Sequence, residues 1–154
     1  MYMLNLHKST LLDVPSIPYH AYMKNGIEHG IGTVEIIVTQ GMMAILDERV
    51  IHPVYSTFWL AYHAELAARR AIEPYFDDTE NAVGSSISLT HKSMAGLGAE
   101  VRITAQVSVV TGRHVLCTIE ARATKTDTLL AEGIQGQVIL SSATLAAKCA
   151  SAVR

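Results

Sequence analysis

Apolar residues recur at intervals of three and four from Tyr55 to Phe76, and at intervals of two along much of the chain that follows. The first spacing is typical of a helix with one buried face. Ser56 and Thr57 can cap its first turn, and Pro74 ends it. The apolar face, unusually rich in alanine, consists of Phe58, Ala61, Ala64, Ala68, Ala71, Ile72 and Tyr75.

The clearest strand pattern lies after this helix. Apolar and polar residues alternate from 101 to 109, and again from 115 to 123 after a turn at Thr111–Arg113. Ala82–Met94 and Leu129–Leu140 have the composition of two further strands. Four strands joined by short turns predict an antiparallel meander.

The remaining segments complete a simple order of elements. The β-branched run at 33–39 predicts a strand, and 47–54 is expected to be a connection into the helix. Residues 1–32, broken by prolines and glycines, predict an irregular lead-in, and 141–154 predict a short C-terminal helix. The whole chain, 1–154, is therefore expected to be one α+β domain whose helix covers an antiparallel sheet.

Composition narrows the possible partners. The chain has 154 residues, of which 49% are hydrophobic and only 17% charged, with a net charge of -2. So little surface charge favours burial of one face in an oligomer. No basic patch indicates nucleic acid, and no apolar run is long enough for a membrane span. The N-terminus lacks a signal-peptide pattern, so a cytoplasmic location is expected.

Metal and cofactor motifs are missing from the sequence. Cys117 and Cys149 match no metal or redox spacing and are expected to be reduced thiols. There is no HExxH, Walker or dinucleotide-binding pattern. We therefore expect neither a metal nor a cofactor.

Several segments carry a resemblance to a known family. They are STFWLAYHAE at 56–65, EPY at 73–75, VGSSISLTH at 83–91 and LGAEVRITA at 97–105. With the order of elements, they resemble the fluoroacetyl-CoA thioesterase group of the hotdog fold, in which a long central helix packs on a curved antiparallel sheet. The resemblance covers a little over half of the chain. It does not reach the first 50 residues, where members of the group build the lid and acyl pocket, so the acyl group is not implied.

The resemblance implies a site of four residues. In that group a threonine begins the helix, a glutamate follows eight residues later, and a histidine ends the next strand seven residues beyond a glycine. These positions are Thr57, Glu65, His91 and Gly84 here. The first three would be catalytic, and Gly84 would line the substrate site.

The chemistry of these residue types suits thioester hydrolysis. A glutamate in a poorly solvated, alanine-lined groove is a stronger base than in water, and it could activate water or attack the carbonyl to form an anhydride. Thr57 could act as nucleophile or hydroxyl donor, His91 as proton relay or anion stabiliser, and the Gly84 amide as a donor. The sequence leaves these alternatives open.

The separation of Thr57 and Glu65 along the predicted helix indicates whether one chain can form the site alone. Thr57 and Glu65 lie roughly 12 Å apart along a helix that rises about 1.5 Å per residue. Either the substrate spans them, or a second chain brings one copy near the other's partner. Since hotdog proteins pair with sites at the seam, we expect a homodimer with composite sites, with a tetramer left open.

Two other functions compete with an acyl-CoA thioesterase that releases free acid and CoA. One is a hotdog enoyl-CoA hydratase or dehydratase, and the other is a non-catalytic protein that binds acyl-CoA or a small ligand. Individual residues also have simpler interpretations. Glu65 could form an ion pair with Arg69 one turn later, and His63 is expected on the surface.

Overall fold

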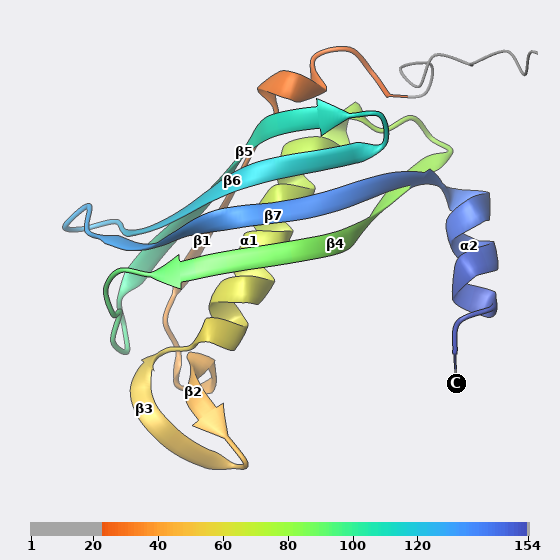
Figure 1. Ribbon diagram of the computed structural model, residues 1–154. Helices are drawn as coiled ribbons and strands as arrows, with labels where there is room; N and C mark the ends of the chain where they lie inside the picture. Colours follow the sequence, from red (N-terminus) through yellow and green to blue (C-terminus); the bar gives the residue numbers. More distant parts are fainter. Residues whose placement is uncertain (1–22, 154) are drawn as a thin grey trace, which may run out of the picture.

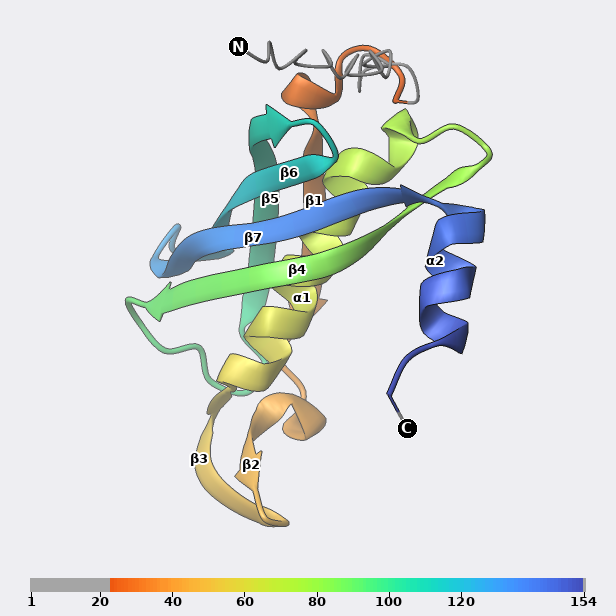
Figure 2. The ribbon, with the colours of Figure 1, turned by 45° about the vertical axis from the view of Figure 1, so that its right-hand side comes forward.

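The computed structural model describes residues 23–153, which form a curved antiparallel sheet wrapped around one long helix (Figures 1 and 2). The helix is α1 (Thr57–Ile72), followed by a short 3-10 turn, η4 (Glu73–Tyr75). The strands of the sheet, in spatial order, are β1 (Ile31–Ile37), β5 (Glu100–Thr111), β6 (His114–Ala123), β7 (Leu129–Ser141) and β4 (Glu80–His91). This arrangement confirms the predicted helix-on-sheet α+β class.

The predicted four-strand meander is wrong in one respect. Only β5, β6 and β7 follow one another as neighbours, whereas β4 pairs with β7 at the opposite edge. The connection at 92–99 is not a tight turn: it passes the start of α1, where the amide of Tyr55 donates to the carbonyl of Ala95 at 2.8 Å. Within residues 23–153, β4 is consequently an edge strand with one side of its backbone unpaired.

The segment before the helix also differs from the expected connection. β2 (Met43–Leu46) and β3 (Arg49–Tyr55) form a hairpin that projects beyond the start of α1 (Figure 1). Its two loop residues, Asp47 and Glu48, both have positive φ, at 50° and 61°. That backbone matches the twist of a two-residue hairpin, although Asp-Glu lacks the glycine by which such turns are usually recognised.

The alanine face of α1 allows very close packing against β1. A Cβ atom on Gly30 would overlap the carbonyl oxygen of Ala71, and one on Gly32 would overlap that of Ala67. Glycine opposite alanine thus brings the helix backbone directly onto the strand. Phe58, predicted on this face, is instead 71% exposed, because the buried stripe runs through Leu60, Ala64, Ala67, Ala68, Ala71 and Ile72.

The two ends of the described chain hold shorter elements. The predicted lead-in falls largely on residues 1–22, outside the described residues, and is followed by η2 (Ile27–His29). A second 3-10 turn, η3 (Gln40–Met42), precedes β2. The predicted C-terminal helix is confirmed as α2 (Ser142–Ala150), which directly follows β7 (Figure 2). None of its side chains is buried.

Candidate active site

Thr57 and His91 meet where the helix begins and β4 ends. Thr57 Oγ1 and His91 Nε2 lie 3.0 Å apart, within hydrogen-bond distance. The hydroxyl is available because Ser56, and not Thr57, caps the helix: Ser56 Oγ accepts from the amide of Trp59 at 3.3 Å. Both side chains open into a pocket of about 340 Å³ that is also lined by His52. The structure therefore gives a hydroxyl–imidazole pair in contact with solvent.

Glu65 and Gly84 meet two helical turns further along. They share a second pocket, of about 470 Å³, between α1 and the start of β4. The carboxylate lies so close to the strand that a Cβ on Gly84 would overlap Glu65 Oε1. Glycine is thus needed at position 84 because a carboxylate occupies the space of its missing side chain.

A β-bulge determines which way Gly84 and His91 face. Residues seven apart on a regular strand point to opposite faces of the sheet. In β4, however, Gly84 pairs with Gln137 and Ser86 with Gly136, which leaves Ser85 as an extra residue. Beyond the bulge His91 pairs with Ala131, which lies six residues from Gln137 on β7 and on the same buried face. Both Gly84 and His91 therefore face the helix side.

The simpler interpretation of Glu65 as the ion-pair partner of Arg69 is wrong. Arg69 instead binds Glu73 at 3.2 Å and donates to the side chain of Asn81 at 2.7 Å. Among the described residues, Glu65 has no ion-pair partner. In the single chain it is exposed and not enclosed in the dry groove that the sequence led us to expect.

The four residues thus form two separate pairs within one chain. Thr57 contacts His91, and Glu65 contacts Gly84, but no hydrogen bond joins the two pairs in the described part of the chain. The separation of Thr57 from Glu65 follows from their positions on one straight helix.

Comparison with known proteins identifies the family. The family model of the fluoroacetyl-CoA-specific thioesterase matches residues 38–143, more than two thirds of the chain. The chain belongs to this family. No curated protein sequence shows significant similarity.

Solved structures agree with this assignment. A Thermus thermophilus protein described as a thioesterase superfamily member is 31% identical, with a TM-score of 0.78 over 82% of this chain and 93% of that one. The fluoroacetyl-CoA thioesterase itself is 22% identical, with a TM-score of 0.72 over 82% of this chain and 96% of that one. A hot-dog-like protein from Thermanaerovibrio acidaminovorans is 19% identical at a TM-score of 0.72, over 82% and 94% of the two chains. The protein is therefore a hotdog-fold thioester hydrolase, as the resemblance predicted.

The thioesterase contains two buried glutamines that the sequence analysis missed. Gln135 and Gln137 occupy inward positions of β7 and are 1% and 2% exposed. Gln137 Nε2 donates to Gln135 Oε1 at 3.1 Å. Two amides at inward positions of an otherwise apolar strand are the signal that would have revealed them, since buried polar groups require partners.

His63 is buried, so its predicted surface position is wrong. It is 4% exposed and stacks on Tyr55, whose hydroxyl lies 2.7 Å from His63 Nδ1. Burial raises the pKa of Tyr55, which keeps its hydroxyl protonated. Burial also lowers the pKa of His63, which keeps the ring neutral. The pair is a neutral, packed contact at the base of the β2–β3 hairpin.

We expect this histidine to make the thioesterase less stable in mild acid. Below about pH 6.5 the His63 ring becomes protonated in the unfolded chain but stays neutral in the folded chain. Unfolding therefore takes up a proton, and the free energy of unfolding falls as the pH decreases. His63→Phe preserves the stacking and removes this proton uptake. Between pH 7.5 and 5.5 its melting temperature should fall by about 2–4 °C less than that of wild type, measured by calorimetry. Equal decreases in the two proteins would contradict the assignment.

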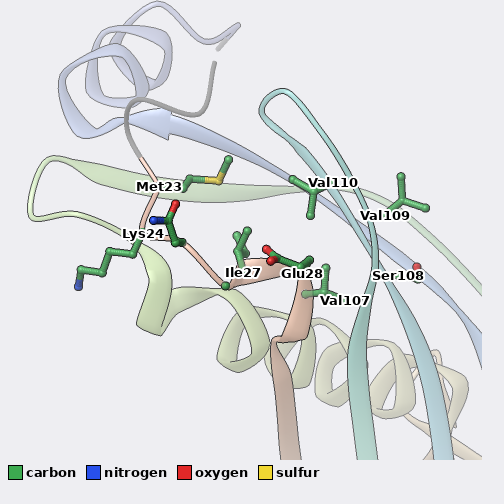
Figure 3. Close-up of a pocket in the computed structure, with 10 residues that line it drawn as sticks. Met23, Lys24, Ile27, Glu28, Val107, Ser108, Val109 and Val110 are labelled. Atoms are coloured by element: carbon green, nitrogen blue, oxygen red, sulfur yellow. The ribbon is translucent and has the colours of Figure 1, made fainter. Parts of the chain in front are cut away.

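Another pocket of the described chain is separate from the candidate site. A pocket of about 500 Å³ lies at the far end of α1, between residues 23–28 and β5 (Figure 3), and is remote from both residue pairs. Its acidic side chain, Glu28, is paired with His29 at 3.7 Å. Within residues 23–153 no cluster of metal-binding side chains occurs, and no helix is long and apolar enough to cross a membrane. Both cysteines are free thiols.

Proposed function

We propose that the protein is an acyl-CoA thioesterase that hydrolyses a small or medium acyl thioester to the free acid and CoA. Its catalytic residues are Thr57, Glu65 and His91, and Gly84 lines the substrate site. The observation that carries this assignment is the position of the Glu65 carboxylate directly against Gly84, in a pocket open to substrate. Relatives solved with acetyl-CoA, and with fluoroacetate and CoA, support a small acyl group.

The reaction needs a base, a nucleophile and donors for the developing oxyanion. Glu65 removes a proton from water, the resulting hydroxide attacks the acyl carbon, and the C–S bond breaks to release the CoA thiolate. The proton held by Glu65 then passes to the leaving sulfur. A thiolate is a competent leaving group, so the main task of the site is to orient the water and to stabilise the oxyanion.

The Thr57–His91 pair supplies donors for that oxyanion. Thr57 sits in the first turn of α1, where backbone amides lack intrahelical acceptors and the positive end of the helix dipole favours negative charge. His91 accepts from or donates to the Thr57 hydroxyl at 3.0 Å and holds it in place. Gly84 lines the same pocket as Glu65, and its backbone amide would be a further donor to the oxyanion.

We further propose that two chains form each site. The exposed edge of β4 is suited to antiparallel pairing with a second copy about a two-fold axis. Such pairing brings the Glu65–Gly84 half of one protomer towards the Thr57–His91 half of its partner. It would also cover Glu65, which is exposed in the single chain.

Mixed dimers test this arrangement. Thr57→Ala and Glu65→Gln chains, each inactive alone, should recover activity after being unfolded and refolded together. A heterodimer then contains one intact composite site, so an equal mixture should show about one quarter of wild-type activity. A mixture as inactive as its components would refute the shared site, and subunit exchange confirmed by mass spectrometry serves as the control.

The test of the activity itself is a hydrolysis screen. Release of free thiol is followed for a series of acyl-CoA esters, from two-carbon to eight-carbon acyl groups, beside the same acyl groups on acyl carrier protein. At least one ester should be hydrolysed with saturation kinetics. Family membership favours hydrolysis over the hydration and simple binding considered from the sequence. Hydration of an enoyl-CoA without thiol release would reverse that preference.

A further inference from the structure

The side-chain amide nitrogen of Gln135 lies close to Gly84, next to the pocket that Glu65 and Gly84 line, and the catalytic residues do not explain its role. A Cβ built on Gly84 would overlap Glu65 Oε1 and would lie 3.4 Å from Gln135 Nε2. The carboxylate oxygen and the amide nitrogen therefore border the same small space above Gly84. No hydrogen bond joins the two groups in the described residues, so each keeps the capacity to bind a further polar atom.

A hydrogen bond from Gln137 holds the side-chain amide of Gln135 in one orientation. Gln137 donates to Gln135 Oε1 at 3.1 Å, and both side chains are almost fully buried, so the amide cannot rotate freely. The opposite end, Nε2, faces the carboxylate, whose negative charge favours an N–H group over a carbonyl oxygen at that place. No buried side-chain nitrogen or oxygen in residues 23–153 lacks a partner. Gln135 Nε2 donates no hydrogen bond within these residues, so it is one of the side-chain atoms that keep some contact with solvent.

We infer that Gln135 positions the water that attacks the thioester, an inference that rests on the proposed function. The water oxygen accepts a hydrogen bond from Gln135 Nε2 and donates one of its protons to Glu65. Its second lone pair remains free to attack the acyl carbon. Glu65 takes the proton, the acyl carbon gains the hydroxide and loses the thiolate, and Gln135 stays neutral throughout. Gln137 acts through Gln135 as a positioning residue.

Substitution with methionine tests the role of the amide nitrogen. Gln135→Met preserves the length of the side chain and removes the donor. Because misplacement of a reacting group by about 1 Å costs on the order of a hundredfold, kcat should fall by about tenfold or more while KM changes little. Gln137→Met, which releases the amide without removing it, should cause a smaller decrease. Gln106→Met, on an exposed position of β5, should match wild type.

A second variant tests the placement independently of turnover. In Gln135→Glu a second carboxylate would face Glu65, and two carboxylates that share a site raise one pKa. The carboxyl groups of residues 65 and 135, followed together by NMR titration without substrate, should titrate as a coupled pair, so that adding Glu65→Gln lowers the pKa of residue 135. If residue 135 lay away from Glu65, it would titrate alike with and without that second substitution.

The outcomes separate this inference from the proposed function. If wild type hydrolyses no acyl-CoA, the proposed function fails. If wild type is active but Gln135→Met loses less than about tenfold in kcat, only the role of Gln135 is overturned. Independent titration of residues 65 and 135 in Gln135→Glu would overturn it as well.

Discussion

Glu65→Gln should lower kcat by about 10²–10⁴-fold on the best acyl-CoA substrate, with little change in KM. The amide has the shape of the carboxylate but cannot accept a proton from water or attack the carbonyl. Because Glu65 is exposed in the single chain and forms no ion pair among the described residues, its replacement should not disturb the fold. Thiol release under saturating substrate gives kcat, and circular dichroism checks the fold.

Glu73→Gln is the matched control for this variant. Glu73 follows the same helix, is also exposed, and carries the same charge, but it binds Arg69 at 3.2 Å. Its replacement should leave kcat within about twofold of wild type, since exposed ion pairs contribute little. If Glu65→Gln were as active as Glu73→Gln, the base would have to be sought elsewhere, and His91 would be the next residue to replace.

Gly84→Ala should reduce kcat/KM by about a hundredfold while the protein remains folded. The new methyl group would overlap Glu65 Oε1, so the carboxylate must move away from β4. The cost to stability is small, because the overlapping atom is the end of a flexible, exposed side chain. A displacement of about 1 Å at the reacting group is enough for the expected loss of rate.

Gly96→Ala provides the comparison, because a Cβ at Gly96 meets no atom within 4 Å. This variant should keep wild-type kinetics, and both variants should melt within a few degrees of wild type. A Gly84→Ala enzyme with full activity would show that the carboxylate need not lie against β4. Loss of activity together with loss of folding would assign Gly84 a structural role instead.

The sequence predicted the long helix, the strands that follow it and the general layering, because each of these depends on local periodicity. It did not predict that β4 lies at the far edge of the sheet. That position depends on the path of the connection at 92–99, whose length and glycines are compatible with a tight turn or a crossover. The β2–β3 hairpin was missed for a related reason: Asp47 and Glu48 adopt positive φ without the usual residues for it.

The candidate site could be named from family spacing, but its geometry could not. Spacing alone could not show that Arg69 turns towards Glu73 and Asn81, which leaves Glu65 without an ion pair among residues 23–153. Nor could it show that His63 is buried against Tyr55, since one polar residue on an apolar helix gives no sign of the partner that satisfies it. The Gln135–Gln137 contact likewise became apparent only when the inward face of β7 was known.

The extra residue at Ser85 restricts how this part of the chain can change in length. An odd interval separates the glycine from the histidine, and only an irregular strand lets both point the same way. Deletion of one residue at the bulge would leave an even interval between the glycine and the histidine. Both positions would then still face the helix side, in a regular strand. Removal of two would turn one of them outward unless the irregularity were kept. Parity of spacing, as well as identity of residues, is therefore a criterion for recognising the same arrangement in distant sequences.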